Sequence, residues 1–277
     1  MRNLLTANFS RLKKDKLLWL AAGAMLIYTV YSIVNRYNPD PEFPNNHHWS
    51  NYYFIDYLFV FPLICALIIA LYIGKDFDNK TVRNKAIAGY SKAAIYLSYL
   101  TMSFIISALI YIVMLIGGLV AIPLFGAPTK IEFNLALYIL IGFVAVLSVA
   151  SAYTFISVAT GSRIKALIAS IVIFFAVLFF SAFIVDLLWR PQFLDHHYTL
   201  VDNEWVEVTG EIPNTYYVGG TLRTVLEYIA EFFPTANALL IRDHMVVNPI
   251  REIALSLLFT VTMSLGGIFV FCKKDMK

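Results

Sequence analysis

Few residues in this 277-residue chain have the types and spacing that catalysis requires. Ser162 and Lys165 form an S-x-x-K pair, in which a lysine amine can take the proton of a nucleophilic serine hydroxyl. They lie in a short turn with no partner motif around them. The chain has no H-E-x-x-H zinc motif, no G-x-S-x-G nucleophile turn and no G-x-x-x-x-G-K-[ST] phosphate loop. The sequence therefore predicts a protein that catalyses no reaction itself.

Five histidines are the remaining candidates for chemistry, because imidazole is a common metal ligand. They are His47, His48, His196, His197 and His244. Neighbouring side chains on extended backbone point to opposite sides, so each adjacent pair offers about one ligand. This pattern allows two interpretations. The two pairs could together form a metal site, or the histidines could lie in solvated loops. We expect solvated loops and no metal site.

One polar stretch, residues 74–98 (GKDFDNKTVRNKAIAGYSKAAIYLS), lies between two of the longest apolar runs. We expect Gly74 to end the run before it, and Gly89 to end a helix of about ten residues, KTVRNKAIAG. Asp76 and Asp78 precede this helix and its cations come later, which suits the helix dipole. A stiff helix held at both ends by membrane spans can transmit force. A flexible basic loop is the alternative on these residues alone.

The composition shows what kind of elements surround this stretch. Hydrophobic residues make up 60% of the chain, charged residues only 14%, and the mean hydropathy is +0.72. Soluble domains are about half apolar and a quarter charged, so this is the composition of a membrane protein. A spanning helix needs about 20 mainly apolar residues. Six charge-free windows satisfy this requirement: 17–34, 57–73, 94–120, 134–161, 166–185 and 253–272.

The charges between these windows predict the orientation of the chain. With six spans both termini lie on one side, and that side holds 15 of the 21 Lys and Arg residues but only four of the 18 Asp and Glu residues. Cytoplasmic loops carry the excess of Lys and Arg. The sequence therefore predicts cytoplasmic termini and a cytoplasmic 74–93 loop, within a single membrane domain that spans residues 1–277.

Residues 1–16 precede the first span and have the pattern of an amphipathic helix. Leu5, Phe9 and Leu12 recur at helical spacing, and the cations are available to face lipid headgroups. These cations are Arg11, Lys13, Lys14 and Lys16. We expect an interfacial elbow along the inner leaflet. A short disordered basic tail is the alternative.

The outer segment, residues 186–251, changes its composition midway. Its first half mixes β-branched and aromatic residues around Asp202-Asn203, which predicts a small hairpin. Its second half is apolar but is interrupted by charges and by Pro234, and neither part is long enough to span. We expect two short helices that meet at Pro234 and dip into the outer leaflet, with their freed backbone groups facing protein or water. The first outer loop, residues 35–56, is expected to be irregular.

Two spans carry stripes of small residues. Ser148 and Ala152 belong to the fourth span, and Ser256, Thr260 and Ser264 recur at i+4 in the sixth. Small residues let helix backbones approach closely in lipid, so we expect packing seams. No Asp, Glu, Lys, Arg or His lies at the centre of any window, which disfavours coupling of transport to protons or sodium.

Two blocks resemble the ABC-2 type permeases, the membrane subunits of bacterial ATP-binding-cassette exporters. The first is the 74–98 stretch, with its acidic pair, T-V-R-N-K run, glycine and Ser-Lys. The second is NTYYVGGTLRTVLEYIAEFFPTANAL, residues 214–239. The six-span layout and the long segment before the last span are also similar. The resemblance implies an all-α integral membrane protein with six transmembrane helices, an N-terminal interfacial helix and a re-entrant helical hairpin between spans 5 and 6.

The resemblance also implies partners and sites. Such permeases pair as two halves, as a homodimer or a heterodimer, and each half docks on a cytoplasmic ATPase subunit that binds ATP and Mg. The chain itself then binds no cofactor, no metal and no nucleic acid. The positions matching the coupling helix that meets the ATPase are Asp76, Phe77, Asp78, Thr81, Arg83, Asn84, Lys85, Gly89 and Ser91. Those matching the re-entrant segment are Tyr217, Gly219, Arg223, Glu227, Glu231, Phe233, Pro234 and Thr235.

The function expected from the resemblance is outward transport of an apolar or amphipathic substrate, such as a peptide antibiotic, a drug or a lipid, across a bacterial plasma membrane. A membrane-anchored sensor whose outer segment binds a ligand is the main alternative, and it needs no ATPase. A membrane-embedded enzyme is a third reading that rests on Ser162 and Lys165 alone.

Overall fold

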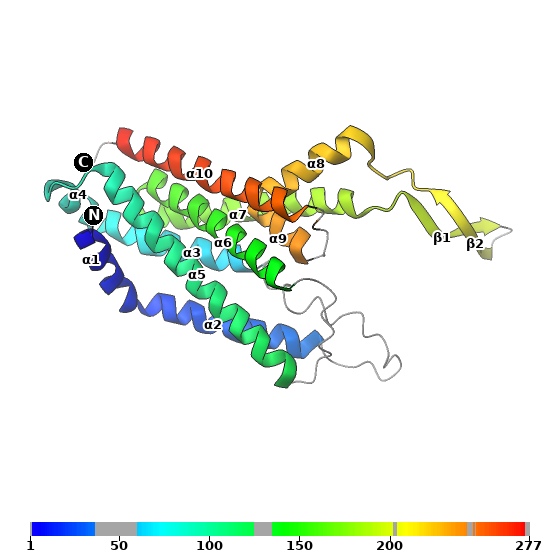
Figure 1. Cartoon of the computed structure of the whole chain (residues 1–277), viewed down its shortest axis with the longest axis horizontal. Helices are drawn as coiled ribbons and strands as arrows, with labels where there is room; N and C mark the ends of the chain where they lie inside the picture. Colours follow the sequence, from blue (N-terminus) through cyan, green and yellow to red (C-terminus); the bar gives the residue numbers. More distant parts are fainter. Residues whose placement is uncertain are drawn as a thin grey trace.

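The computed structural model describes residues 2–36, 60–124, 135–201, 204–242, 246 and 248–274. Within these ranges the chain forms long helices that run side by side, followed by a two-stranded hairpin and three further helices (Figure 1). Both chain ends lie at the same end of the bundle, and the hairpin projects from the opposite end (Figure 1). The elements are α1 (Arg2–Lys13), α2 (Lys16–Arg36), α3 (Phe61–Asp78), α4 (Thr81–Ile87), α5 (Lys92–Leu124), α6 (Leu135–Thr160), α7 (Arg163–Trp189), β1 (Phe193–Val201), β2 (Glu204–Pro213), α8 (Gly220–Phe232), α9 (Pro234–Arg242) and α10 (Pro249–Lys273).

Five helices in the described ranges are long and apolar enough to cross a membrane. They contain the segments Lys16–Val34, Lys92–Ala121, Ala136–Thr160, Arg163–Trp189 and Pro249–Lys273. These segments match five of the six predicted windows. The predicted second span begins at residue 57, and the described part of it starts in α3 at Phe61. The predicted first outer loop lies almost entirely outside the described residues.

Helix α3 lies in the middle of the bundle, packed against α6 and α7. Gly74 faces the start of α7, where an added Cβ would lie 2.5 Å from the Cα of Arg163. The glycine is needed for this close approach and does not end the helix. The prediction that the second span ends at Gly74 is wrong, because α3 continues to Asp78.

The small-residue stripes form a packing seam between α6 and α10, as expected. The Ser148 hydroxyl donates to the Ser256 carbonyl oxygen at 2.7 Å and lies 3.0 Å from the Thr260 hydroxyl. Both ends of this contact are polar groups that would be costly to leave unpaired in lipid. The hydroxyls therefore hold two helices together.

The outer segment contains the predicted hairpin and the two predicted short helices. Strands β1 and β2 pair antiparallel on either side of residues 202 and 203, which lie outside the described ranges. Two short helices follow, and the break between α8 and α9 falls at Phe233 and Pro234. Proline cannot donate the backbone bond that would continue α8. Helix α8 packs on α7 and α10, and α9 packs on α7 and α6, at the hairpin end of the bundle (Figure 1).

Candidate functional site

A buried carboxylate at the inner end of the bundle, the end that carries both chain termini, joins four helices. Asp76 is in the last turn of α3 and is only 1% exposed. Its Oδ2 accepts from Lys85 Nζ of α4 and from the Tyr99 hydroxyl of α5, each at 2.7 Å. Its Oδ1 accepts from Arg11 Nη1 of α1. Both oxygens are therefore satisfied by charged or hydroxyl donors from three different helices.

Further contacts tie α1 into the same cluster through Asn8, which is buried in the middle of the helix. Asn8 Oδ1 accepts from Lys85 at 3.1 Å, and Asn8 Nδ2 donates to the Ser98 hydroxyl of α5 at 3.1 Å. The Tyr72 hydroxyl donates to the Asn8 carbonyl oxygen. The guanidinium of Arg11 stacks over the Tyr72 ring, 4.4 Å from its centre. We call Asn8, Arg11, Tyr72, Asp76, Lys85, Ser98 and Tyr99 the inner polar cluster.

The electrostatics of this cluster follow from its burial. Burial lowers the pKa of Lys85, and the neighbouring Asp76 carboxylate offsets only part of that effect. Burial acts in the same direction on Arg11, but Asp76 and Tyr72 together outweigh it and raise the pKa of the guanidinium above its ordinary value. Removing one partner of such a buried ion pair leaves the other charge without compensation, which destabilises a protein by about 3–5 kcal/mol.

The acidic pair is not placed as predicted. Asp76 and Asp78 belong to the end of α3 and do not start α4, so neither carboxylate serves the dipole of α4. Asp78 instead accepts the backbone N–H of Arg163 at 3.2 Å, at the first residue of α7. In the sequence Asp78 comes just before α4, but in the structure it bonds to the start of α7. The helix that the carboxylate caps is therefore decided by a contact between residues distant in sequence.

The other predicted coupling residues divide between structural and exposed positions. Phe77 meets the Phe271 ring of α10 edge to face at 6.3 Å, and Lys274 Nζ lies over the Phe77 ring, 5.2 Å from its centre. Burial lowers the pKa of Lys274, and the nearby Lys165 adds to this shift. Ser91 caps α5, since its hydroxyl accepts the backbone N–H of Ala94. These residues connect the inner ends of the helices.

The exposed residues of this set lie on α4 and just after it. Helix α4 has seven residues where about ten were expected, and it ends before Gly89, whose positive φ of 87° confirms its predicted role as a helix stop. Arg83 and Asn84 are exposed, and Thr81 is half-buried. Ile87 is 73% exposed although it is apolar. This outward face of α4 is a small mixed surface of one cation, one amide and one aliphatic side chain.

A second polar cluster lies at the opposite end, on α8 and α10. Arg251 Nε donates to Glu231 Oε2 at 2.6 Å, and the second oxygen of Glu231 also binds this guanidinium. Arg251 also lies 3.6 Å from Glu227, which pairs with Arg223 of the same helix. Arg223 donates to the carbonyl oxygen of Leu188 at the end of α7 and stacks over Tyr217. These bonds fasten α8 to two of the long helices.

The helix break itself lines an apolar cavity. Phe233, Pro234 and Thr235 face a space of about 240 Å³ together with side chains of α3, α6, α7 and α10. Phe233 also contacts the rings of Phe180 and Phe259. Gly219 and Gly220 begin α8, and Gly220 has a positive φ of 63°. All the predicted outer residues therefore lie on the α8–α9 unit or in the turn that leads into it.

Sequence reasoning missed several members of both clusters. Arg11 was expected to face lipid headgroups, and the apolar face of α1 was expected at Leu5, Phe9 and Leu12. The buried row is instead Leu4, Asn8 and Leu12, and Phe9 is exposed. Asn8 in the middle of an amphipathic helix was the available signal, because a buried amide needs partners. Arg251, which the sequence analysis did not single out, is a partner of Glu231.

This architecture is that of a multi-pass membrane protein with the short exposed helix α4 at one end and the two short helices α8 and α9 at the other. The sequence model of the family described as "ABC-2 family transporter protein" matches residues 4–182. The chain belongs to this family. Membership makes it a permease-type membrane subunit that associates with an ABC ATPase. No curated protein matches the chain. The matched region contains the inner polar cluster and α4 and stops before α8.

Proposed function

We propose that the chain is the transmembrane subunit of an ABC exporter that moves an apolar or amphipathic substrate, such as a peptide antibiotic, a drug or a lipid, out of a bacterial cell. ATP and Mg bind to a separate ATPase subunit, which supplies the energy. Two ATPase subunits and a second permease subunit, identical or homologous, complete the complex in the plasma membrane. Both termini lie in the cytoplasm, on the side where Lys and Arg are concentrated.

The exposed face of α4 is the observation that carries this proposal. Arg83, Asn84 and Ile87 point away from the bundle, while Lys85 on the other side of the same helix is bonded to the buried Asp76. An exposed aliphatic side chain beside a cation suits a protein interface, because it offers buried apolar area at the centre and charge at the rim. A force applied to this face reaches α1, α3 and α5 through one carboxylate.

The opposite end supports the direction of transport. The α8–α9 unit lies on the outer side if the termini are cytoplasmic, and its turn at Pro234 lines the apolar cavity among α3, α6, α7 and α10. A cavity lined almost entirely by aliphatic and aromatic side chains suits an apolar or amphipathic substrate. We assign to this unit the role of a cap at the exit, with Glu231 and Arg251 holding it on α10.

Copurification with the ATPase tests the proposal. The full chain carries an affinity tag and is extracted from its native membrane, and ABC ATPase is measured in the eluate by immunodetection and by ATP hydrolysis. We expect Arg83→Glu and Ile87→Asp each to reduce the recovered ATPase at least about tenfold, since interface hot spots cost about 2 kcal/mol or more. Lys165→Glu is the matched control, an exposed inner-side cation outside α4.

The same preparations, placed in inside-out vesicles, test the direction. We expect ATP-dependent uptake of an amphipathic peptide by the parent chain and by the Lys165 variant, and none by the α4 variants. Equal ATPase recovery from all four chains would exclude α4 as the docking helix. A chain that copurifies no ATPase and transports nothing, but whose outer segment binds a ligand, would be the membrane-anchored sensor.

A further inference from the structure

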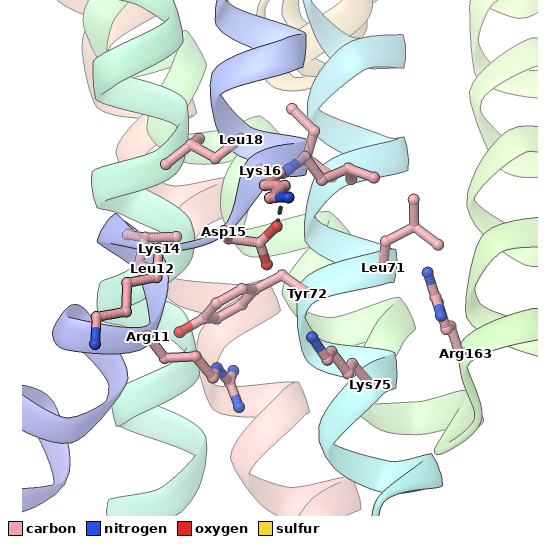
Figure 2. Close-up of a pocket in the computed structure, with 12 residues that line it drawn as sticks. Arg11, Leu12, Lys14, Asp15, Lys16, Leu18, Leu71, Tyr72, Lys75 and Arg163 are labelled. Carbon is pink, nitrogen blue, oxygen red and sulfur yellow. Dashed lines mark hydrogen bonds between the residues drawn. The ribbon is translucent and has the colours of Figure 1, made fainter.

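A basic cavity lies at the inner end of the bundle, next to the inner polar cluster, and shares Arg11 and Tyr72 with it. Its volume is about 490 Å³, and it lies between the α1–α2 turn, the last turns of α3 and the first residue of α7 (Figure 2). Its polar lining consists of Arg11, Lys14, Asp15, Lys16, Lys75 and Arg163, with Tyr72 at one wall. Five cations thus face a single carboxylate.

Within the part of the chain that the structure describes, most of this charge has no ion-pair partner. Arg11 is bonded to Asp76, but within the described residues Lys14, Lys16, Lys75 and Arg163 form no ion pair. Asp15 has a different task, since its Oδ1 accepts the backbone N–H of Leu17 and caps the start of α2. Four like charges around one cavity repel each other, so an anion bound among them is favoured.

The apolar lining lies on the membrane side of these cations. Leu71 is one turn deeper along α3 than Lys75, about 6 Å, and Ile68 about 10 Å, at 1.5 Å per residue. Leu17 and Leu18 line the same cavity from α2, and Leu17 is 37% exposed. Figure 2 shows the Arg163 side chain reaching beside Leu71. A ligand that fills this space has a negative group at the inner end and hydrocarbon above it.

The position of the cavity matches the depth of lipid headgroups. It lies where α1 meets α2, the first segment long enough to span a membrane. Trp19, one turn into α2, donates its indole N–H to the Lys13 carbonyl oxygen at 3.0 Å, and tryptophan is enriched at this level of a bilayer. Basic pockets between membrane helices on the cytoplasmic side bind the headgroups of anionic lipids.

We propose that this cavity binds the phosphate-bearing headgroup of an anionic phospholipid of the inner leaflet. Lys75 and Arg163 hold the phosphate from α3 and α7, Lys14 and Lys16 hold it from the α1–α2 turn, and the acyl chains run along Leu17 and Leu71. A free phosphate would use the cations but not the apolar wall. A zwitterionic lipid would use the wall but would bring its own cation. The bound lipid bridges α1, α3 and α7.

Lipid binding by the purified full-length chain tests this assignment. Native mass spectrometry of the detergent-solubilised protein counts bound lipids during titration with phosphatidylglycerol, with phosphatidylcholine, or with inorganic phosphate as a competitor. We expect phosphatidylglycerol to bind at least about tenfold more tightly than phosphatidylcholine. Each cation contributes about fivefold, about 1 kcal/mol, so Lys75→Gln with Arg163→Gln weakens the first binding event about 25-fold.

The matched control removes the same charge from the same side of the molecule. Lys13→Gln with Lys165→Gln changes two exposed cations that do not line the cavity, and we expect its affinity within twofold of the parent chain. Asp15→Asn keeps an oxygen for the α2 cap and removes the one negative charge, so it strengthens binding about fivefold. If the Lys75→Gln, Arg163→Gln double variant does not fold, the affinity of the Asp15→Asn variant for phosphatidylglycerol still tests the proposal.

Three outcomes overturn the proposal. Equal weakening by the control pair means general attraction to a basic surface. Displacement of phosphatidylglycerol by inorganic phosphate at similar concentration means a site for soluble anions. Equal affinity for both lipids means an apolar groove in which charge has no part. The assay contains no ATPase, so none of these results bears on the coupling role of α4.

Discussion

At the scale of single residues, Asp76 has the most consequences in this structure. Its carboxylate is almost fully buried and receives donors from Arg11, Lys85 and Tyr99, which come from three helices. A buried charge without partners costs several kcal/mol, whereas a paired and hydrogen-bonded one is tolerated. The same residue thus makes the inner end of the bundle sensitive to the loss of any one partner.

We expect Asp76→Ala to destabilise the protein by about 3–5 kcal/mol, because Arg11 and Lys85 would remain as partly buried cations without their shared counter-charge. Asp78→Ala is the control. It lies two residues away, is exposed, and caps only α7, so it should cost about 1 kcal/mol. Thermal unfolding of both purified variants in detergent measures the difference.

The double change Asp76→Asn with Lys85→Met separates charge from packing. It removes the carboxylate and one cation together, and its loss of stability should be smaller than the sum of the two single changes. If Asp76→Ala and Asp78→Ala melt at the same temperature, the carboxylate does not organise the inner polar cluster as described.

At the scale of elements, the sequence predicts helices well and their contacts poorly. Hydropathy finds the long spans, and Gly89 and Pro234 mark two helix boundaries correctly, because these residues act through their own backbone. Gly74 was misread as a helix end, although its role is to let the backbone of Arg163 approach. The burial of Asn8 and the inward turn of Arg11 likewise depend on neighbours distant in sequence, which periodicity cannot show.

The reassigned role of Gly74 leads to a further prediction. We expect Gly74→Ala to destabilise the bundle by about 1–3 kcal/mol, because the added Cβ would meet the backbone of Arg163 and push α3 away from α7. Gly266→Ala is the control, since nothing lies within 4 Å of a Cβ added there in α10. Alanine also favours a helix over glycine by about 1 kcal/mol, so this control should be neutral or stabilising.

Unfolding of both variants in the same detergent provides the measurement. A Gly74→Ala protein as stable as the parent chain would mean that α3 and α7 can separate without loss, and the contact would then be incidental. In that case Gly74 would have no special role in the packing of α3 against α7.

At the scale of the whole molecule, the two ends of the bundle differ in charge and in architecture. One end carries both termini, α4 and the basic cavity, and the other carries the hairpin and the α8–α9 unit (Figure 1). This arrangement follows from sequence, because loop charges and span number predict the side on which each segment lies. The depth of α8 and α9 in the membrane does not follow from it, since the carboxylates of α8 are paired within the protein with Arg223 and Arg251.

Cysteine labelling in intact cells tests the orientation. In a chain with Cys65→Ala and Cys272→Ser, a membrane-impermeant maleimide should label Tyr216→Cys from outside, and should label Arg83→Cys only after the membrane is opened. Both positions are exposed in the structure, so in cells that lack the ATPase subunit access to the reagent depends on the membrane alone. Labelling of Arg83→Cys in sealed cells would reverse the orientation and remove the basis for an exporter.

The length of α5 has a mechanical consequence. Its 33 residues extend for about 50 Å, whereas the hydrocarbon layer is only about 30 Å thick. The helix begins after Ser91, whose hydroxyl caps it next to α4, and no proline interrupts it before its final turn. A tilt imposed on α5 at the end next to α4 therefore moves its opposite end sideways, on the other side of the hydrocarbon layer.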